Sequence, residues 1–267
     1  MNQRVELLII DPQIDFCDPC VGALYVPQAE QDMQRLAALI RRLKERIAAI
    51  HVTLDSHHFI HIAHPIFWHN AQGEHPPPFT QITLADVENG KWTTSQPGLL
   101  PRAFAYVQQL AQNGRYELTI WPPHCLLGSS GHAVDPTLFA ALQEWEEQYA
   151  CVDFISKGSN LLTEHYSAVQ ADVPDANDPT TQINTRLIQA LEAADLVVIA
   201  GEARTHCVAN TVRDIADHFR DAASVQKLVL LTDASSDIPG FEPHAQRFLE
   251  EMTARGMQLS TTTEFWG

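Results

Sequence analysis

Short apolar runs rich in valine, isoleucine and leucine recur along the chain, and each leads through polar or turn-forming residues into a segment with helical periodicity. Such runs are typical of buried parallel strands. The predicted strands are Val5–Ile10, Ile47–Leu54, Cys151–Ser156, Leu196–Ala200 and Lys227–Thr232, with a weaker candidate at Met257–Thr262. The predicted helices are Gln28–Arg46, Pro136–Gln148, Thr181–Ala193, Cys207–Arg220 and Pro243–Arg255.

Strands that alternate with helices imply right-handed crossovers and a mostly parallel central sheet with helices on both faces, which is a three-layer α/β fold. Two segments interrupt this alternation: 70–118, which holds a Pro-rich run and one predicted helix near Gly98–Asn113, and the polar segment 170–180. Pro-rich segments neither continue helices nor fit central strands, so both are expected to be surface insertions. We therefore expect a single domain over 1–267, with an insertion at about 70–118 long enough to form a lid.

The composition indicates a soluble protein that acts on small molecules. The 267 residues are 45% hydrophobic, enough for one sizeable core. A formal net charge of -16 argues against a nucleic-acid partner, because lysine and arginine carry that affinity. No apolar stretch approaches the roughly 18 residues of a membrane span, and no secretion signal is evident. Five cysteines without a disulfide-framework spacing favour a reducing, cytoplasmic location.

Polar residues with catalytic potential follow the predicted strands, at the carboxyl ends where open parallel sheets bind ligands. Asp11 follows the first strand, Asp55 follows the second with His57 two residues later, Lys157 follows the third, and the fourth leads into the turn that carries Cys207. Taken singly, each has a plain structural explanation, such as a helix cap, a solvated lysine or a buried thiol. Their joint placement predicts one site.

Cys207 is the predicted nucleophile. It lies where a strand has ended and a helix begins, so the helix N-terminus and a nearby lysine are expected to depress the pKa of its thiol. Asp11 would take the thiol proton and later give it to a departing amine. The turn from Ala203 to Cys207 offers backbone N–H groups for a tetrahedral oxyanion.

Asp55 and His57 form the core of a predicted metal site. They are separated by one residue on an extended segment, so both side chains project to the same side. A third ligand is needed, and the nearby His61 and His64 are candidates alongside a histidine from elsewhere in the chain. Aspartate with two histidines suits zinc, iron or manganese.

Six short motifs occur together and in one order along most of the chain. They are Asp11-x-Gln13-x-Asp15-Phe16, Asp55-x-His57-x-x-x-His61-Ile62, Trp121-Pro-x-His124-Cys125, Ser156-Lys157-Gly158, Glu164-x-Tyr166-Ser167-Ala168 and the turn from Gly201 to Cys207-Val208. This set resembles the nicotinamidase branch of the isochorismatase-like hydrolases. The resemblance spans residues 5 to about 235.

The resemblance implies a metal-containing amidohydrolase of NAD salvage. Its substrate would be nicotinamide or a similar heteroaryl carboxamide, hydrolysed to the acid and ammonia through a thioester at Cys207. The resemblance assigns the residues as follows: a catalytic triad of Asp11, Lys157 and Cys207; oxyanion N–H groups of Ala203 and Cys207; divalent metal ligands Asp55, His57 and His124, with zinc favoured; and substrate-binding residues Phe16 and Gln13. A cis peptide is expected between Glu202 and Ala203.

The sequence also departs from the family, and these departures leave the substrate open. Ser56 and His58 replace the usual Trp and Pro around the metal motif, and Glu202 and Arg204 stand where small, aliphatic or Thr residues are usual. Glu202 is expected to contact a polar group of the substrate, or else to point outward. Alternative functions are another C–N hydrolase acting on an N-carbamoyl or ureido substrate, and a non-catalytic binding or scaffold protein. Many relatives assemble, so a homo-oligomer is compatible with the resemblance.

Overall fold

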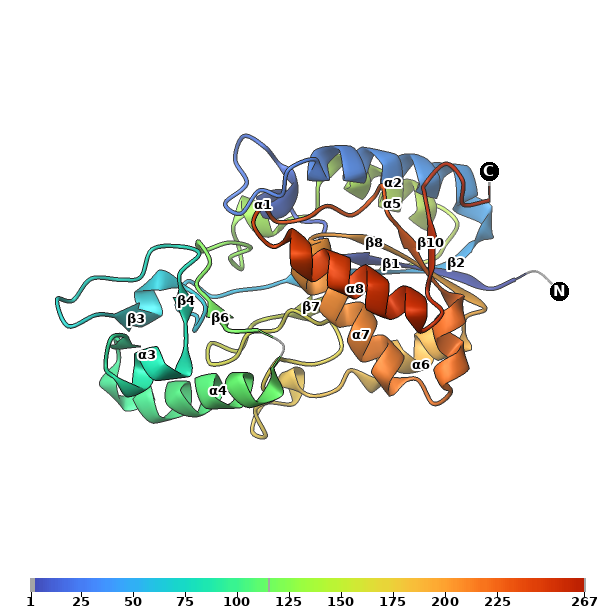
Figure 1. Ribbon diagram of the computed structural model, residues 1–267. Helices are drawn as coiled ribbons and strands as arrows, with labels where there is room; N and C mark the ends of the chain where they lie inside the picture. Colours follow the sequence, from blue (N-terminus) through green and yellow to red (C-terminus); the bar gives the residue numbers. More distant parts are fainter. Residues whose placement is uncertain (1–2, 115, 267) are drawn as a thin grey trace.

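The computed structural model describes residues 3–114 and 116–266, and within these residues six parallel strands form one central sheet in the order β10-β9-β8-β1-β2-β7 (Figure 1). The strands are β1 Val5–Ile10, β2 Ile47–Asp55, β7 Asp153–Lys157, β8 Leu196–Gly201, β9 Leu228–Leu231 and β10 Gln258–Ser260. Every residue of β1 is buried, because the strand lies inside the sheet with helices on both faces. The predicted three-layer α/β fold is confirmed.

Five long helices form the two outer layers. On one face α2 (Ala29–Leu43) packs against α5 (Pro136–Glu146), and on the other lie α6 (Thr185–Ala193), α7 (Ala209–His218) and α8 (Glu242–Ala254) (Figure 1). Helix α2 buries residues at helical spacing, namely Met33, Leu36, Ala37 and Ile40. None of the helices in the described part of the chain has both the length and the apolar character needed to cross a lipid bilayer.

Several element boundaries differ from the prediction for local reasons. Helix α6 begins at Thr185 rather than Thr181, because the side chain of Asn184 accepts a hydrogen bond from the Leu187 N–H at 3.1 Å and so caps the helix. Strand β7 begins at Asp153, two residues later than predicted, and ends at Lys157, one residue later than predicted. The helix after β8 begins with a π-helical turn, Arg204–Val208, so Cys207 lies inside the first turn.

Residues 70–118 contribute most of an appendage at one end of the sheet (Figure 1, left). It contains α3 (Leu84–Glu88) and α4 (Leu100–Asn113), the second of which was predicted. Two antiparallel pairs of two-residue strands complete it, β3 (Trp68–His69) with β5 (Thr93–Thr94), and β4 (Gln81–Ile82) with β6 (Leu118–Thr119). A 3₁₀ turn, Pro97–Leu99, directly precedes α4, and the short helices outside segment 70–118 are α1 Ile14–Cys17 and the 3₁₀ turns Lys44–Arg46, Pro65–Phe67, Ser130–His132, Pro179–Thr181 and Ala222–Lys227.

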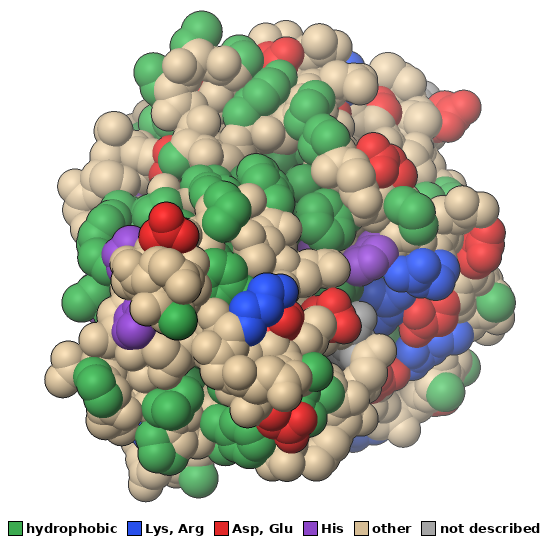
Figure 2. All heavy atoms as spheres, turned by 60° about the vertical axis from the view of Figure 1, so that its left-hand side comes forward, with side chains coloured by type: hydrophobic (Ala, Val, Ile, Leu, Met, Phe, Trp, Pro, Cys, Tyr) green, Lys and Arg blue, Asp and Glu red, His purple; other side chains and the backbone are tan. Residues whose placement is uncertain are grey.

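The end of the molecule formed by this appendage has a mixed surface. Figure 2 shows apolar side chains spread over it, with acidic, basic and histidine side chains between them. Within the appendage, the side chain of Phe79 is 52% exposed. Polar groups thus interrupt the apolar surface on this face.

The strand order brings the predicted site residues to one edge. Strands β8, β1, β2 and β7 are consecutive neighbours in the sheet, although they are far apart in sequence. Asp55 pairs with Lys157 in register, and Ile10 pairs with Gly201. Residues at or just beyond the carboxyl ends of these four strands therefore face a common space.

Candidate active site

The structure brings Asp11, Lys157 and Cys207 together. The Nζ atom of Lys157 lies 2.8 Å from Oδ2 of Asp11 and 3.6 Å from Sγ of Cys207. Thr53 orients the carboxylate, because its hydroxyl donates to Oδ1 of Asp11 at 2.6 Å. All three side chains are buried, with Cys207 the most accessible at 7%. An acid, an ammonium group and a thiol thus share one enclosed space.

Burial dominates the electrostatics of this group. It raises the pKa of the Cys207 thiol well above its usual range, and Asp11 and Asp55 add to the rise while Lys157 opposes it. Burial likewise raises the pKa of Asp11 against the effect of Lys157. Burial disfavours the Lys157 ammonium, yet Asp11, Asp55 and Cys207 hold its pKa well above the ordinary value. The expected depression of the Cys207 pKa was therefore wrong for the resting protein, because a helix terminus and one lysine do not offset burial beside two carboxylates.

Asp55, His57 and His124 form a compact donor set for a metal ion. Oδ2 of Asp55 lies 3.0 Å from Nε2 of His57 and 3.3 Å from Nε2 of His124. The Nδ1 atoms of the two histidines contact the carbonyl oxygens of Gly158, at 3.2 Å, and Pro122, at 2.8 Å. A carbonyl only accepts, so each Nδ1 carries the proton and each Nε2 is left to bind a cation. This set fits a divalent metal with an open coordination position.

A second histidine group is less suited to a metal. Donor atoms of His57, His61 and His64 also lie within 4.8 Å of one another. In His61, however, Nδ1 accepts the Ala63 N–H at 3.2 Å and Nε2 contacts the Thr163 carbonyl oxygen at 3.2 Å, so neither nitrogen is free. The Nε2 atom of His64 is buried and has no hydrogen-bond partner among the described residues. His61 therefore has a structural role, and His64 leaves one ring nitrogen without a partner next to the donor set of Asp55, His57 and His124.

Gly158 allows the close approach on which this donor set depends. Its φ is +85°, and a Cβ there would lie 2.8 Å from Oδ1 of Asp55 and 3.1 Å from Cε1 of His57. We expect Gly158→Ala to lower metal affinity by about tenfold or more, because the methyl group displaces both ligands. Isothermal titration with Zn²⁺ measures the change. Gly90→Ala is the control, because Gly90 has a φ of +69° but nothing within 4 Å of the added carbon. Equal affinities in the two variants would contradict the prediction.

Gln13 and Phe16 lie next to the candidate metal donors. Gln13 holds the backbone of Asp55 from both sides, because its Nε2 donates to the Asp55 carbonyl and its Oε1 accepts the Asp55 N–H, each at 2.7 Å. It is fully buried and orients Asp55, and its contact with substrate stays a prediction. The ring of Phe16 meets His124 edge-on, with centroids 5.3 Å apart. Phe16 therefore presents an apolar wall beside the donor set.

The turn before Cys207 has the expected backbone but not the expected side-chain orientation. The peptide bond between Glu202 and Ala203 is cis, as predicted. The described residues offer no acceptor to the Ala203 N–H, which leaves it free for an oxyanion. The carboxyl of Glu202 bonds to Ser236 and Asp32 instead of entering the site, so its predicted contact with substrate is wrong. Arg204 is paired with Asp237 at 2.7 Å.

Two site residues had no assigned role in the sequence analysis. Thr53 lies two positions before Asp55 on β2, so strand alternation places its side chain on the same side, where it bonds to Asp11. Glu164, known only as part of a motif, places Oε1 3.9 Å from Nε2 of His57. Its Oε2 is buried with no partner among the described residues. Unpaired buried oxygens beside the donor set are further signs of a bound group.

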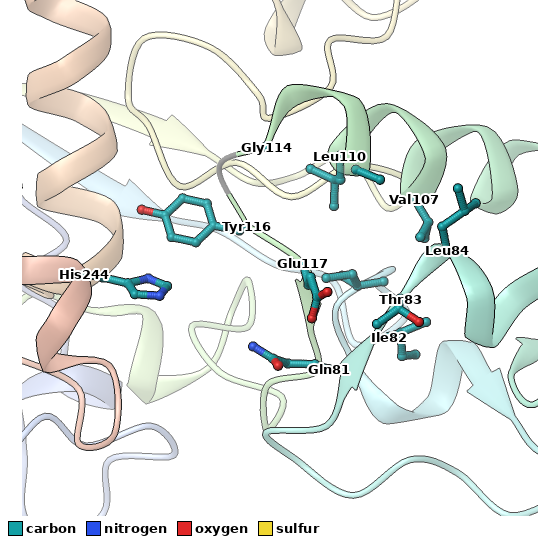
Figure 3. Close-up of a pocket in the computed structure, with 12 residues that line it drawn as sticks. Gln81, Ile82, Thr83, Leu84, Val107, Leu110, Gly114, Tyr116, Glu117 and His244 are labelled. Atoms are coloured by element: carbon teal, nitrogen blue, oxygen red, sulfur yellow. The ribbon is translucent and has the colours of Figure 1, made fainter. Parts of the chain in front are cut away.

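One cavity of about 440 Å³ lies between the appendage and α8 (Figure 3). Tyr116 and His244 face each other at one end of it, and Leu110 and Val107 line the other. Neither the triad nor the metal donors line this cavity. It approaches the site only indirectly, because the ring of Tyr116 stacks on that of His206, 5.4 Å away, next to Cys207 in sequence.

Comparison with solved structures identifies the fold. No family model matches the sequence, and no curated protein is similar to it in sequence. Yeast nicotinamidase matches with a TM-score of 0.66 and 21% identity over 96% of this chain and 98% of its own. A nicotinamidase pyrazinamidase of Acinetobacter baumanii matches with a TM-score of 0.64 and 20% identity over 98% of this chain and 97% of its own. A pyrazinamidase of Pyrococcus horikoshii was solved in complex with zinc. It matches with a TM-score of 0.55 and 22% identity over 97% of this chain and 99% of its own. This chain therefore has the isochorismatase-like α/β fold of the nicotinamidases and pyrazinamidases.

Proposed function

We propose that this chain is a cysteine amidohydrolase that converts nicotinamide, or a similar heteroaryl carboxamide, to the carboxylic acid and ammonia. The observation that carries the proposal is the contact of Lys157 with both Asp11, at 2.8 Å, and Cys207, at 3.6 Å. Structures with the same fold include yeast nicotinamidase bound to the inhibitor nicotinaldehyde and a protein of L. infantum in complex with nicotinate. These ligands support an aromatic acid or amide as the substrate class.

The side chains present can perform both half-reactions. Asp11 takes the thiol proton of Cys207 as the sulfur attacks the amide carbon, and Lys157 stabilises the charge on sulfur. The N–H groups of Ala203 and Cys207 hold the oxyanion. Collapse breaks the C–N bond, the proton on Asp11 moves to the leaving nitrogen, and ammonia and a thioester result. Water then attacks the thioester with Asp11 as base, which releases the acid and restores the thiol.

Asp55, His57 and His124 would hold the divalent metal. Zinc is the best candidate, because two imidazoles and one carboxylate suit it and because the Pyrococcus protein was solved with zinc. When bound, the ion supplies a Lewis-acidic anchor for the ring nitrogen of the substrate. Phe16, beside His124, would pack against the ring.

The segment 70–118 is proposed to cover this site. Phe79 meets Trp121 edge-on with centroids 5.8 Å apart, and Trp121 in turn contacts His206, directly before Cys207, at 5.1 Å. A path of aromatic contacts thus joins the appendage to the nucleophile turn. A cover of this kind would exclude water from the thioester until ammonia has left the site.

Ammonia release from a panel of carboxamides tests the function. Nicotinamide is expected to turn over fastest. Benzamide, which lacks only the ring nitrogen, should react about tenfold or more slowly in the metal-loaded protein, because it cannot use the metal as an anchor. After chelation the nicotinamide rate should fall to about the benzamide rate. Release of ammonia from a ureido compound alone would instead favour the alternative C–N hydrolase, and full nicotinamide activity in metal-free protein would overturn the role of the metal.

A further inference from the structure

Behind the nucleophile turn lies a second buried network of charged groups. The turn is joined to the loop after β9 by hydrogen bonds from Gly201 N–H to the Ala234 carbonyl, at 2.9 Å, and from Arg204 N–H to the Ser236 carbonyl, at 2.8 Å. The Ser236 N–H donates to Oε2 of Glu202 at 3.1 Å. Glu202 is fully buried, and it immediately precedes Ala203, whose N–H is proposed to bind the oxyanion.

Two carboxyl groups meet inside this network. Asp32 on α2 has its own partners, because Oδ1 pairs with Arg35 at 2.6 Å and Oδ2 accepts the Ser236 hydroxyl at 2.5 Å. Glu202 also contacts Asp32, and its Oε1 has no donor from any described residue. Two carboxyl oxygens can bond only with a proton between them, and Oε1 of Glu202 is the oxygen that no donor from the described residues occupies. Burial and Asp32 raise the pKa of Glu202 well above its usual range, against weaker effects of Ser236 and Arg204.

The other charged or titratable groups around Glu202 do not neutralise it. Arg204 is held by both carboxylate oxygens of Asp237, at 3.0 and 2.7 Å. Arg35 is paired with Asp32. The buried thiol of Cys17 on α1 faces Glu202 and has its own pKa raised by burial and by Glu202. An ionised Glu202 would therefore lie against a second carboxylate without a cation of its own.

We propose that Glu202, as a neutral carboxylic acid next to Asp32, is a positioning residue that fixes the turn from Ala203 to Cys207, and that its ionisation as pH rises loosens this turn. The catalytic part of this inference rests on the proposed amidase function.

Stability against pH tests the protonation state without any activity. A raised pKa in the folded protein means that stability is complete below about pH 4.5 and is lost as pH rises toward the folded pKa, since only the unfolded chain then gains the charge. Glu202→Gln cannot ionise and keeps a donor for Asp32. Its Tm relative to the wild type should therefore rise between pH 5 and pH 9, by about 3 °C or more. A flat or falling difference would overturn the inference.

Glu6→Gln is the matched control. Glu6 is equally buried, but it contacts His51 at 3.1 Å and Arg4 at 2.7 Å, which lower its pKa although burial opposes this. A lowered pKa contributes stability above about pH 4.5. Glu6 is thus ionised in both the folded and the unfolded state between pH 5 and pH 9, so Glu6→Gln should have a lower Tm than the wild type in this range, where Glu202→Gln should gain Tm over the wild type. A Glu202→Gln protein that, like Glu6→Gln, has a lower Tm than the wild type at pH 9 would reject the neutral state of Glu202.

Kinetics test the positioning role. Glu202→Gln should keep kcat within about threefold of the wild type at pH 7. Between pH 7 and pH 9, the kcat of this variant should decline less than that of the wild type. Glu202→Leu, which bonds to neither Asp32 nor Ser236, should lower kcat by about tenfold with KM little changed, as expected of a group that acts mainly in the transition state. Full kcat in a folded Glu202→Leu protein would refute the positioning role. A wild type that hydrolyses no carboxamide would refute the proposed function, while the Tm comparison would still decide the state of Glu202.

Discussion

Replacing Cys207 by alanine should abolish ammonia release from nicotinamide, by about 10⁴-fold or more, and leave the protein folded. The sulfur forms the bond to the acyl carbon, and neither Asp11 nor Lys157 can replace it. Removing one buried thiol leaves only a small cavity, so Tm should change little. Ammonia release and thermal unfolding, measured on the same sample, check both parts.

Two controls make this test decisive. Cys125→Ala removes another fully buried thiol that is not bonded to Lys157, so it should keep its turnover if it folds. Incubation of the wild type with substrate, followed by acid quenching and mass spectrometry, should reveal an adduct of the acyl group that is absent from Cys207→Ala. Substantial turnover in Cys207→Ala would reject the nucleophile and with it the proposed mechanism.

Lys157→Met should cost both stability and activity. The ammonium group lies 2.8 Å from Asp11 and 3.2 Å from Asp55, and its side chain is 1% exposed. Without it, two carboxylates are left buried together, which should lower the free energy of unfolding by about 3–5 kcal/mol. Turnover should be lost as well, because the charge on sulfur loses its nearest cation. Denaturant unfolding and the ammonia assay measure the two effects.

A double variant separates charge from packing. Asp11→Asn together with Lys157→Met removes both members of the pair, so it should be more stable than Lys157→Met alone, since one uncompensated carboxylate has gone. It should nevertheless remain inactive, because the general base is missing. If the double variant were as unstable as the sum of the single variants, the loss in Lys157→Met would come from packing instead of charge.

The long strands of the sheet and the meeting of the site residues could be predicted because both depend on patterns that are continuous in sequence. Strand β1 was located to the residue, since a fully buried parallel strand is a continuous apolar run. The polar residue after each such run then had to lie at the same edge. By contrast, β3 to β6 have two residues each, too few to show any periodicity.

Side-chain orientation and protonation could not be predicted, because they depend on partners far away in sequence. Glu202 turns toward Asp32, 170 positions earlier, rather than toward the substrate. The Nε2 atom of His61 contacts the carbonyl oxygen of Thr163, and no local sequence spacing predicts this contact. The pKa of Cys207 depends on how completely the fold buries it, and no motif encodes that.

Lys157 is held differently from the other members of the triad. Asp11 and Cys207 follow β1 and β8, which have neighbours on both sides, whereas β7 is the last strand of the sheet and is bonded only to β2. An outermost strand opens at a lower free energy than the interior of a sheet. The ammonium group is thus the member of the triad that a local fluctuation removes first. Such a protein would lose its chemistry under mild stress while most of its backbone amides remained protected from exchange.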